Sequence, residues 1–276
     1  MKDQGLRTVW PVVDGEKTRC RAAPAGYEVG NEASPRMPLL LLHGLGCSSD
    51  AWTPSLRVLA GRGLPQPAYA PDFPGCGRTR NAGGALDMDE LGDWTARLMD
   101  VLEIERAHVA GNSLGCQAAL ALARRHPARV GGLALLGPTT GPALESFWRY
   151  ALGLLLDGLV EPPAYNLTLL KMYAQMGLPR YVATLRHMMA DDPLAQIDRV
   201  QAPCLVLRGG KDGIVPERAA RELAAALPRG EYRELDSTAH AAGFNTPELF
   251  ADATLKFLAH AEREMREADR ELLAGG

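Results

Sequence analysis

The sequence contains no apolar run long enough to cross a bilayer, and its first twenty residues lack the apolar segment of a secretory signal. It also lacks a strong charge of either sign, because 33 acidic residues stand against 30 basic ones and the formal net charge is −3. This balance provides no electrostatic reason to expect nucleic acid or an anionic membrane as a partner. We therefore expect a soluble, cytoplasmic protein that acts on a small molecule, and the sequence does not predict its oligomeric state.

Cysteine is scarce and has no regular spacing. The chain has five cysteines, an odd number, and no C-x-x-C pair. This argues against both a disulfide framework and a zinc site, and it fits a reducing cytosol. The chain also lacks the G-x-x-x-x-G-K-[ST], G-x-G-x-x-G and H-E-x-x-H motifs, so we expect no nucleotide cofactor and no catalytic metal.

Short apolar runs alternate with longer helical patterns over most of the 276 residues. "MPLLLLHG" (37–44) is continuously apolar, which is typical of a strand buried on both faces. This alternation predicts an α/β fold with a doubly wound, mostly parallel sheet. The alternation stops between 139 and 201, where prolines interrupt helical patterns rich in Leu, Met and Tyr. We expect residues 1–138 and 202–276 to form the core domain and 139–201 to form a helical cap inserted into it.

Candidate catalytic side chains follow three of the expected strands. In an open sheet of this kind, chemistry takes place beyond the carboxyl ends of the strands. Ser113 lies there in "GNSLG", Asp212 in "GGKDGIVP" and His240 in "STAHAAGFN". A serine nucleophile needs a base to accept its proton and a carboxylate to orient that base, so these three residues predict a catalytic triad.

The sequence around Ser113 has the form G-x-S-x-G, which is typical of a sharp turn from a strand into a helix. Gly111 and Gly115 supply the small neighbours that such a turn needs. The backbone N–H groups of Leu114 and Leu45 are then candidate donors to an oxyanion.

In "HGLG", "DFPGCGRT", "GNSLG", "KDGIVP" and "AHAAGFNTPE", taken in this order, the chain resembles the α/β-hydrolase superfamily from about residue 8 to residue 260. The resemblance implies that Ser113 is the nucleophile, Asp212 the acid and His240 the base. It further implies that Leu45 and Leu114 form the oxyanion hole and that 139–201 covers the pocket.

The leading hypothesis is a serine hydrolase that cleaves a carboxylic ester, thioester or lactone of a small, mainly apolar substrate. A C–C bond hydrolase of the meta-cleavage type, or an enzyme like a hydroxynitrile lyase, is the alternative on the same triad. A non-enzymatic receptor for a small ligand is a third reading, because fold alone does not determine function.

Several further expectations concern the pocket and the titratable groups. The candidates for substrate binding are Gly44, Trp52, Trp148, Met172 and Met176, and Phe73 is a further residue that we expect to line the pocket. The apolar cap and its scattered cations predict uncharged, medium-length or aromatic acyl groups. We expect His43 to bond within its own loop, His240 to titrate at about pH 6.5 to 7, and the charges of the C-terminal helix to be solvated.

Overall fold

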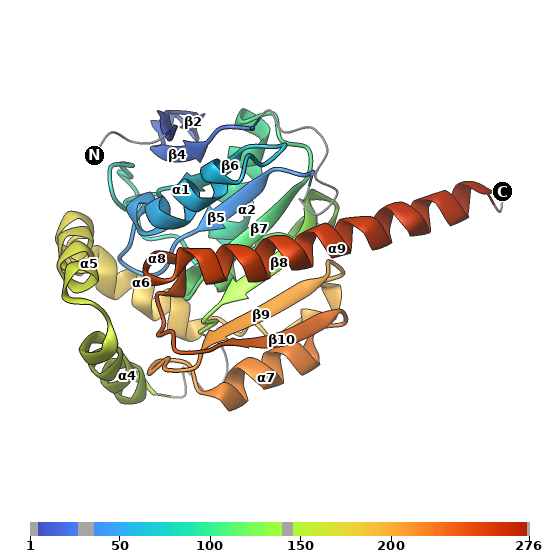
Figure 1. The fold of residues 1–276 in the computed structure, drawn as a ribbon. Helices are drawn as coiled ribbons and strands as arrows, with labels where there is room; N and C mark the ends of the chain where they lie inside the picture. Colours follow the sequence, from blue (N-terminus) through green and yellow to red (C-terminus); the bar gives the residue numbers. More distant parts are fainter. Residues whose placement is uncertain (1–4, 27–35, 140–145, 275–276) are drawn as a thin grey trace.

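The computed structural model describes residues 5–26, 36–139 and 146–274, and its centre is an eight-stranded sheet (Figure 1). In spatial order the strands are β1 (Arg7–Val9), β4 (Cys20–Ala23), β6 (Ala68–Pro71), β5 (Leu39–Leu42), β7 (Ala107–Asn112), β8 (Val130–Leu136), β9 (Cys204–Gly209) and β10 (Gly230–Leu235). From β6 to β10 all neighbours are parallel, whereas β4 is antiparallel to both β1 and β6. The expected α/β fold with a mostly parallel sheet is therefore confirmed.

Helices cover both faces of the sheet. One face packs against α1 (Thr53–Gly61), α8 (Ala242–Asn245) and α9 (Pro247–Ala274), and the other against α2 (Met88–Val101), α3 (Leu114–Arg125) and α7 (Glu217–Ala226). A separate hairpin of β2 (Val12–Val13) and β3 (Glu16–Lys17) lies near α2. Short 3₁₀ turns occupy η1 (Ser49–Trp52), η2 (Pro127–Arg129) and η4 (Ile197–Arg199).

Strand β5 shows why the sequence folds in this way. Leu39 and Leu41 point into the core on the α1 and α9 side, while Leu40 and Leu42 point into the core on the α2 and α3 side. A strand with apolar side chains on both faces needs helices on both faces, as its continuous run of leucines predicts. Among the described residues, no helix is long and apolar enough to cross a membrane.

Three consecutive helices lie between β8 and β9. They are α4 (Phe147–Val160), α5 (Pro163–Met176) and α6 (Leu178–Ala190), and we call them the helical insertion. Figure 1 shows α4 and α5 standing apart from the sheet at one end of the molecule. The expected cap segment begins at 139, but residues 140–145 lie outside the described part of the chain.

The expectation that the charges of the C-terminal helix are all solvated is wrong for Glu262, which is 2% exposed. Its carboxylate accepts hydrogen bonds from His108 Nε2 at 2.9 Å and from the backbone N–H groups of Arg36 and Met37. Burial alone would raise the pKa of Glu262, but these donors lower it to about 2. Glu262 thus joins α9 to β7 and to the segment that enters β5.

Replacement of Glu262 should therefore destabilise the fold. We expect Glu262→Ala to lower the free energy of unfolding by about 3–5 kcal/mol, because it leaves buried donors without an acceptor. Since the pKa of Glu262 lies below its ordinary value of 4.5, its contribution is present above about pH 4.5 and is lost as the pH falls towards 2. Urea unfolding at neutral and acid pH measures both effects.

Glu264→Ala is the matched control on the same helix. Glu264 is exposed and pairs with Arg229 at 3.0 Å, so its loss should change the stability by less than about 1 kcal/mol. Equal losses for the two variants would contradict the anchoring role of Glu262.

Candidate functional site

Ser113 lies in the sharp turn between β7 and α3. Its backbone has φ 55° and ψ −119°, in the left-handed region that non-glycine residues rarely adopt. A Cβ atom on Gly111 would lie 2.4 Å from the carbonyl oxygen of Gly115, and one on Gly115 would lie 2.2 Å from that of Leu42. Only glycine fits at these two positions, so the packing around the turn requires the flanking residues that the motif supplies.

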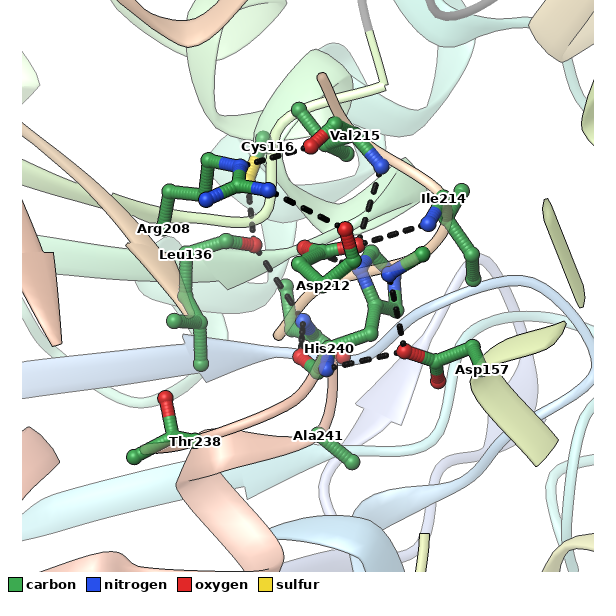
Figure 2. A network of polar contacts seen from close by, with 12 residues as sticks. Cys116, Leu136, Asp157, Arg208, Asp212, Ile214, Val215, Thr238, His240 and Ala241 are labelled. Carbon is green, nitrogen blue, oxygen red and sulfur yellow. Dashed lines mark hydrogen bonds and ion pairs between the residues drawn. The ribbon is translucent and has the colours of Figure 1, made fainter. Parts of the chain in front are cut away.

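His240 and Asp212 lie in the loops that follow β10 and β9. His240 Nδ1 is 2.8 Å from Asp212 Oδ2, and the other carboxylate oxygen accepts the N–H groups of Ile214 at 2.8 Å and Val215 at 2.9 Å (Figure 2). The carboxylate is thus held in place by the backbone of its own loop while it faces the imidazole. Asp236, which lies four residues before His240, is exposed and makes no such contact among the described residues.

Ser113 and His240 line one cavity of about 50 Å³ beneath the helical insertion. Asn112, the residue before Ser113, donates from Nδ2 to the carbonyl oxygen of His240 at 3.3 Å. This contact joins the serine turn to the histidine loop. The three residues predicted from separate strand ends therefore come together at one edge of the sheet.

The two expected oxyanion donors also lie at this edge. Leu45 lines the cavity, and Gly44 is packed so closely that a Cβ on it would lie 3.3 Å from Ser113 Cβ. Leu114 is the first residue of α3, whose N-terminal N–H groups have no partners within the helix. Among the described residues, no acceptor is recorded for the N–H of Leu45 or Leu114.

Two other residues near the site are structural. His43 Nδ1 lies 2.9 Å from the Gly44 carbonyl and its Nε2 accepts the N–H of Phe73 at 3.0 Å, which confirms that His43 holds its own loop. Cys116 is buried, and its Sγ contacts the carbonyl oxygens of Gly111 and Leu136 at 3.3 Å. Neither side chain is free to act as a nucleophile or base.

Two carboxylates of the helical insertion enter the same cavity and were missed from the sequence. Asp157 Oδ1 accepts the backbone N–H of His240 at 3.2 Å and that of Gly213 at 3.3 Å. Glu161 Oε1 accepts the N–H of Ala241 at 2.8 Å, and Oε2 bonds Asn245. The four-residue spacing from Asp157 to Glu161 places both on one helical face. This spacing is the sequence feature from which the pair could have been predicted.

These acids change the electrostatics around His240. Burial lowers the pKa of His240, but the carboxylate of Asp212 and then those of Asp157 and Glu161 outweigh it and raise the pKa to about 9. Burial also raises the pKa of Asp157, and it raises that of Glu161 to about 7. The expected titration of His240 at pH 6.5 to 7 therefore shifts upward.

Most of the other expected substrate contacts are not at the cavity. Trp52 is 2% exposed and packs against Phe250 in the core, and Trp148 is 78% exposed on the outer face of α4.

Met172 is buried but is not among the described residues that line the cavity. Met176 and Phe73 line a second, smaller cavity of about 20 Å³ behind Gly44 and Leu45. The helical periodicity of the sequence does not predict which face of each helix of the insertion lines the cavity.

The arrangement of these groups can be compared with known proteins. A model of the alpha/beta hydrolase family matches residues 39–253. The chain belongs to this family. The resemblance seen in the five motifs is thereby confirmed, and the matched region includes Ser113, Asp212 and His240.

Three similar proteins are named as hydrolases or as a lactonase, and their names differ in the bond that is cleaved. A putative carbamate hydrolase, RutD of Caulobacter segnis, is 27% identical over 257 residues, which cover 84% of this chain and 95% of that protein. A 2-hydroxy-6-oxononadienedioate/2-hydroxy-6-oxononatrienedioate hydrolase of Paraburkholderia phymatum is 29% identical and covers 80% and 86%. The enol-lactonase from Burkholderia xenovorans LB400 matches with a TM-score of 0.71, at 23% identity, over 91% of this chain and 99% of that one. The chain is thus a hydrolase of the alpha/beta family.

The pKa of His240 generates a prediction for the rate profile. A base must be neutral to accept a proton, so kcat/KM for an ester should rise with pH through about 9. Asp157→Asn should move this limb to lower pH, because it removes a negative charge that favours the imidazolium form. Initial rates between about pH 6 and pH 10 measure this rise in kcat/KM for the wild type and for Asp157→Asn. A wild-type rate that is already constant from mildly acid to neutral pH would contradict the assignment of His240 as the base.

Proposed function

We propose that the protein is a serine hydrolase that cleaves a carboxylic ester, thioester or lactone of a small molecule. The observation that carries the proposal is the hydrogen bond from His240 to Asp212 beside a serine held in a strained turn at the same cavity. The cavity, at about 50 Å³, has room for a small group only, since one water occupies at least about 10–15 Å³ on this measure.

The proposed reaction has two steps. In the first step Ser113 Oγ attacks the substrate carbonyl carbon, His240 Nε2 accepts the serine proton, and the carbonyl oxygen becomes an oxyanion that the N–H groups of Leu45 and Leu114 stabilise. His240 then passes the proton to the leaving alkoxide or thiolate, which becomes the alcohol or thiol (tethered to the acyl group in a lactone), and an acyl-serine remains. In the second step His240 activates water, which attacks the acyl group and releases the acid.

Asp212 supports both steps without exchanging protons. Because its Oδ2 faces His240 Nδ1, the ring carries its proton on Nδ1 and leaves Nε2 as the acceptor. The negative charge of Asp212 also stabilises the imidazolium that forms after each proton transfer.

The cavity favours this reaction over the cleavage of C–C bonds in a dicarboxylate. The name of the Paraburkholderia phymatum relative describes a substrate with two carboxylate groups. In the present chain Asp157 and Glu161 face the cavity, and its described lining includes no lysine or arginine. The carboxylates of Asp157 and Glu161 repel a negatively charged substrate in the same cavity, so a dianion is a poor substrate.

The role of the triad is tested by single substitutions. We expect Ser113→Ala to lower kcat for p-nitrophenyl acetate and butyrate by about 10⁴–10⁶-fold, because alanine fits the turn and lacks the attacking oxygen. Asp212→Asn should lower kcat by about 10⁴-fold, because it favours the wrong tautomer of His240.

Two controls keep this test specific. Ser49→Ala removes a buried serine hydroxyl outside the cavity, and Asp236→Asn removes an exposed carboxylate, so each should stay within a few-fold of the wild-type rate. The same proteins are also assayed on a vinylogous diketone. A Ser113→Ala variant that keeps its esterase rate, or a wild type that cleaves only the diketone, would contradict the proposed function.

A further inference from the structure

The cavity above Ser113 combines aromatic rings with unneutralised acids. Tyr150, Tyr165 and Tyr173 of the helical insertion line it together with Asp157 and Glu161. Aromatic faces and carboxylates both attract cations, the former through the ring quadrupole and the latter through charge. His240 is the only described lining residue that can carry positive charge, and its partner is Asp212.

Neither acid has a cationic partner in the described part of the chain. Asp212 is paired with His240, whereas the recorded partners of Asp157 and Glu161 are backbone N–H groups and the amide of Asn245. Buried carboxylates normally have a cationic partner or bind a metal ion. Among the described residues, no group of three or more His, Cys, Asp or Glu side chains is arranged to hold a metal ion.

Two polar atoms at the cavity also have no hydrogen-bond partner among the described residues. Asp157 is 6% exposed, and both of its recorded hydrogen bonds go to Oδ1, which leaves Oδ2 without a partner among the described residues. Tyr150 is 3% exposed, and its hydroxyl likewise has no recorded partner there. A polar atom that borders a cavity and has no protein partner is positioned to bond a ligand.

We propose that this cavity selects substrates that carry an ammonium group, which the carboxylates of Asp157 and Glu161 bind beside the ring of Tyr150. The inference rests on the proposed serine hydrolase activity and adds the charge of its substrate. It revises the expectation of uncharged substrates, which rested on the apolar residues of the cap, because the acids rather than the exposed leucines of α4 face the nucleophile.

The experiment compares esters of the same shape that differ in charge. On the acyl side, methyl 3-aminopropanoate is a cation at about pH 7.5 and methyl butanoate is its neutral counterpart. On the alcohol side, acetylcholine is compared with 3,3-dimethylbutyl acetate. Each kcat/KM is divided by the rate constant for hydroxide-catalysed hydrolysis of the same ester, which removes differences in intrinsic reactivity. We expect the cation to be favoured at least about tenfold in one of the two pairs, a factor that corresponds to about 1.4 kcal/mol.

Substitution of the acids then tests the origin of that preference. Asp157→Asn keeps the shape and the Oδ1 acceptor but removes the charge, so the cation-to-neutral ratio should fall towards one. The ratio is informative even if the variant lowers both rates. Asp198→Asn is the matched control, because it makes the same charge change at an exposed position in η4 outside the cavity. Glu161→Gln provides a second variant if Asp157→Asn does not fold.

The outcomes separate the two proposals. If the neutral esters are hydrolysed and neither cation is favoured, the inference is wrong while the serine hydrolase proposal stands. If the preference is present but unchanged in both Asp157→Asn and Glu161→Gln, these acids do not bind the cation and the inference is again wrong. If none of the esters is hydrolysed, the proposed function fails and the inference fails with it.

Discussion

The site depends on one constraint, the left-handed backbone of Ser113 where β7 passes into α3. A non-glycine residue adopts this conformation only where the surroundings enforce it, and here β7 and α3 are both buried in the core. The close contacts of Gly111 and Gly115 hold the turn against the end of β5, which also carries the loop with Gly44 and Leu45. The strained turn therefore determines both where the serine lies and which N–H groups surround it.

The helical insertion contributes to the same site through its acids. Asp157 bonds the N–H groups of Gly213 and His240, so one carboxylate contacts both the loop of Asp212 and the loop of His240. Glu161 likewise accepts the N–H of Ala241, the residue after His240. Asp157 and Glu161, four residues apart, hold the insertion on the core beside Asp212 and His240. The position of the insertion and the geometry of His240 are thus linked, and a movement of α4 would alter both.

The sequence was sufficient to predict the parts of the site that depend on the sheet. Apolar runs located the parallel strands, and the residues after them located Ser113, Asp212 and His240, because the ends of parallel strands meet at one edge. It was not sufficient for the lining of the pocket, where Trp52 of the core domain and Trp148 of the insertion were expected and Asp157 and Glu161 were not. Trp52 and Trp148 lie at opposite extremes of burial although both are tryptophans, since side-chain type alone does not determine which face of a helix turns inward. Glu262 was misjudged because the partners that bury it, His108 and the N–H of Met37, lie more than a hundred residues away in the chain.

The central claim is that Ser113 is a nucleophile activated by His240, and covalent labelling tests it most directly. A fluorophosphonate reacts with an activated serine, and peptide mass spectrometry identifies the modified residue. The account predicts one adduct per chain, on Ser113, and labelling slowed by orders of magnitude in His240→Ala. Labelling should be unaffected in His260→Ala, which replaces an exposed histidine. Intact wild-type protein that forms no adduct, or that forms one on another residue, would contradict it.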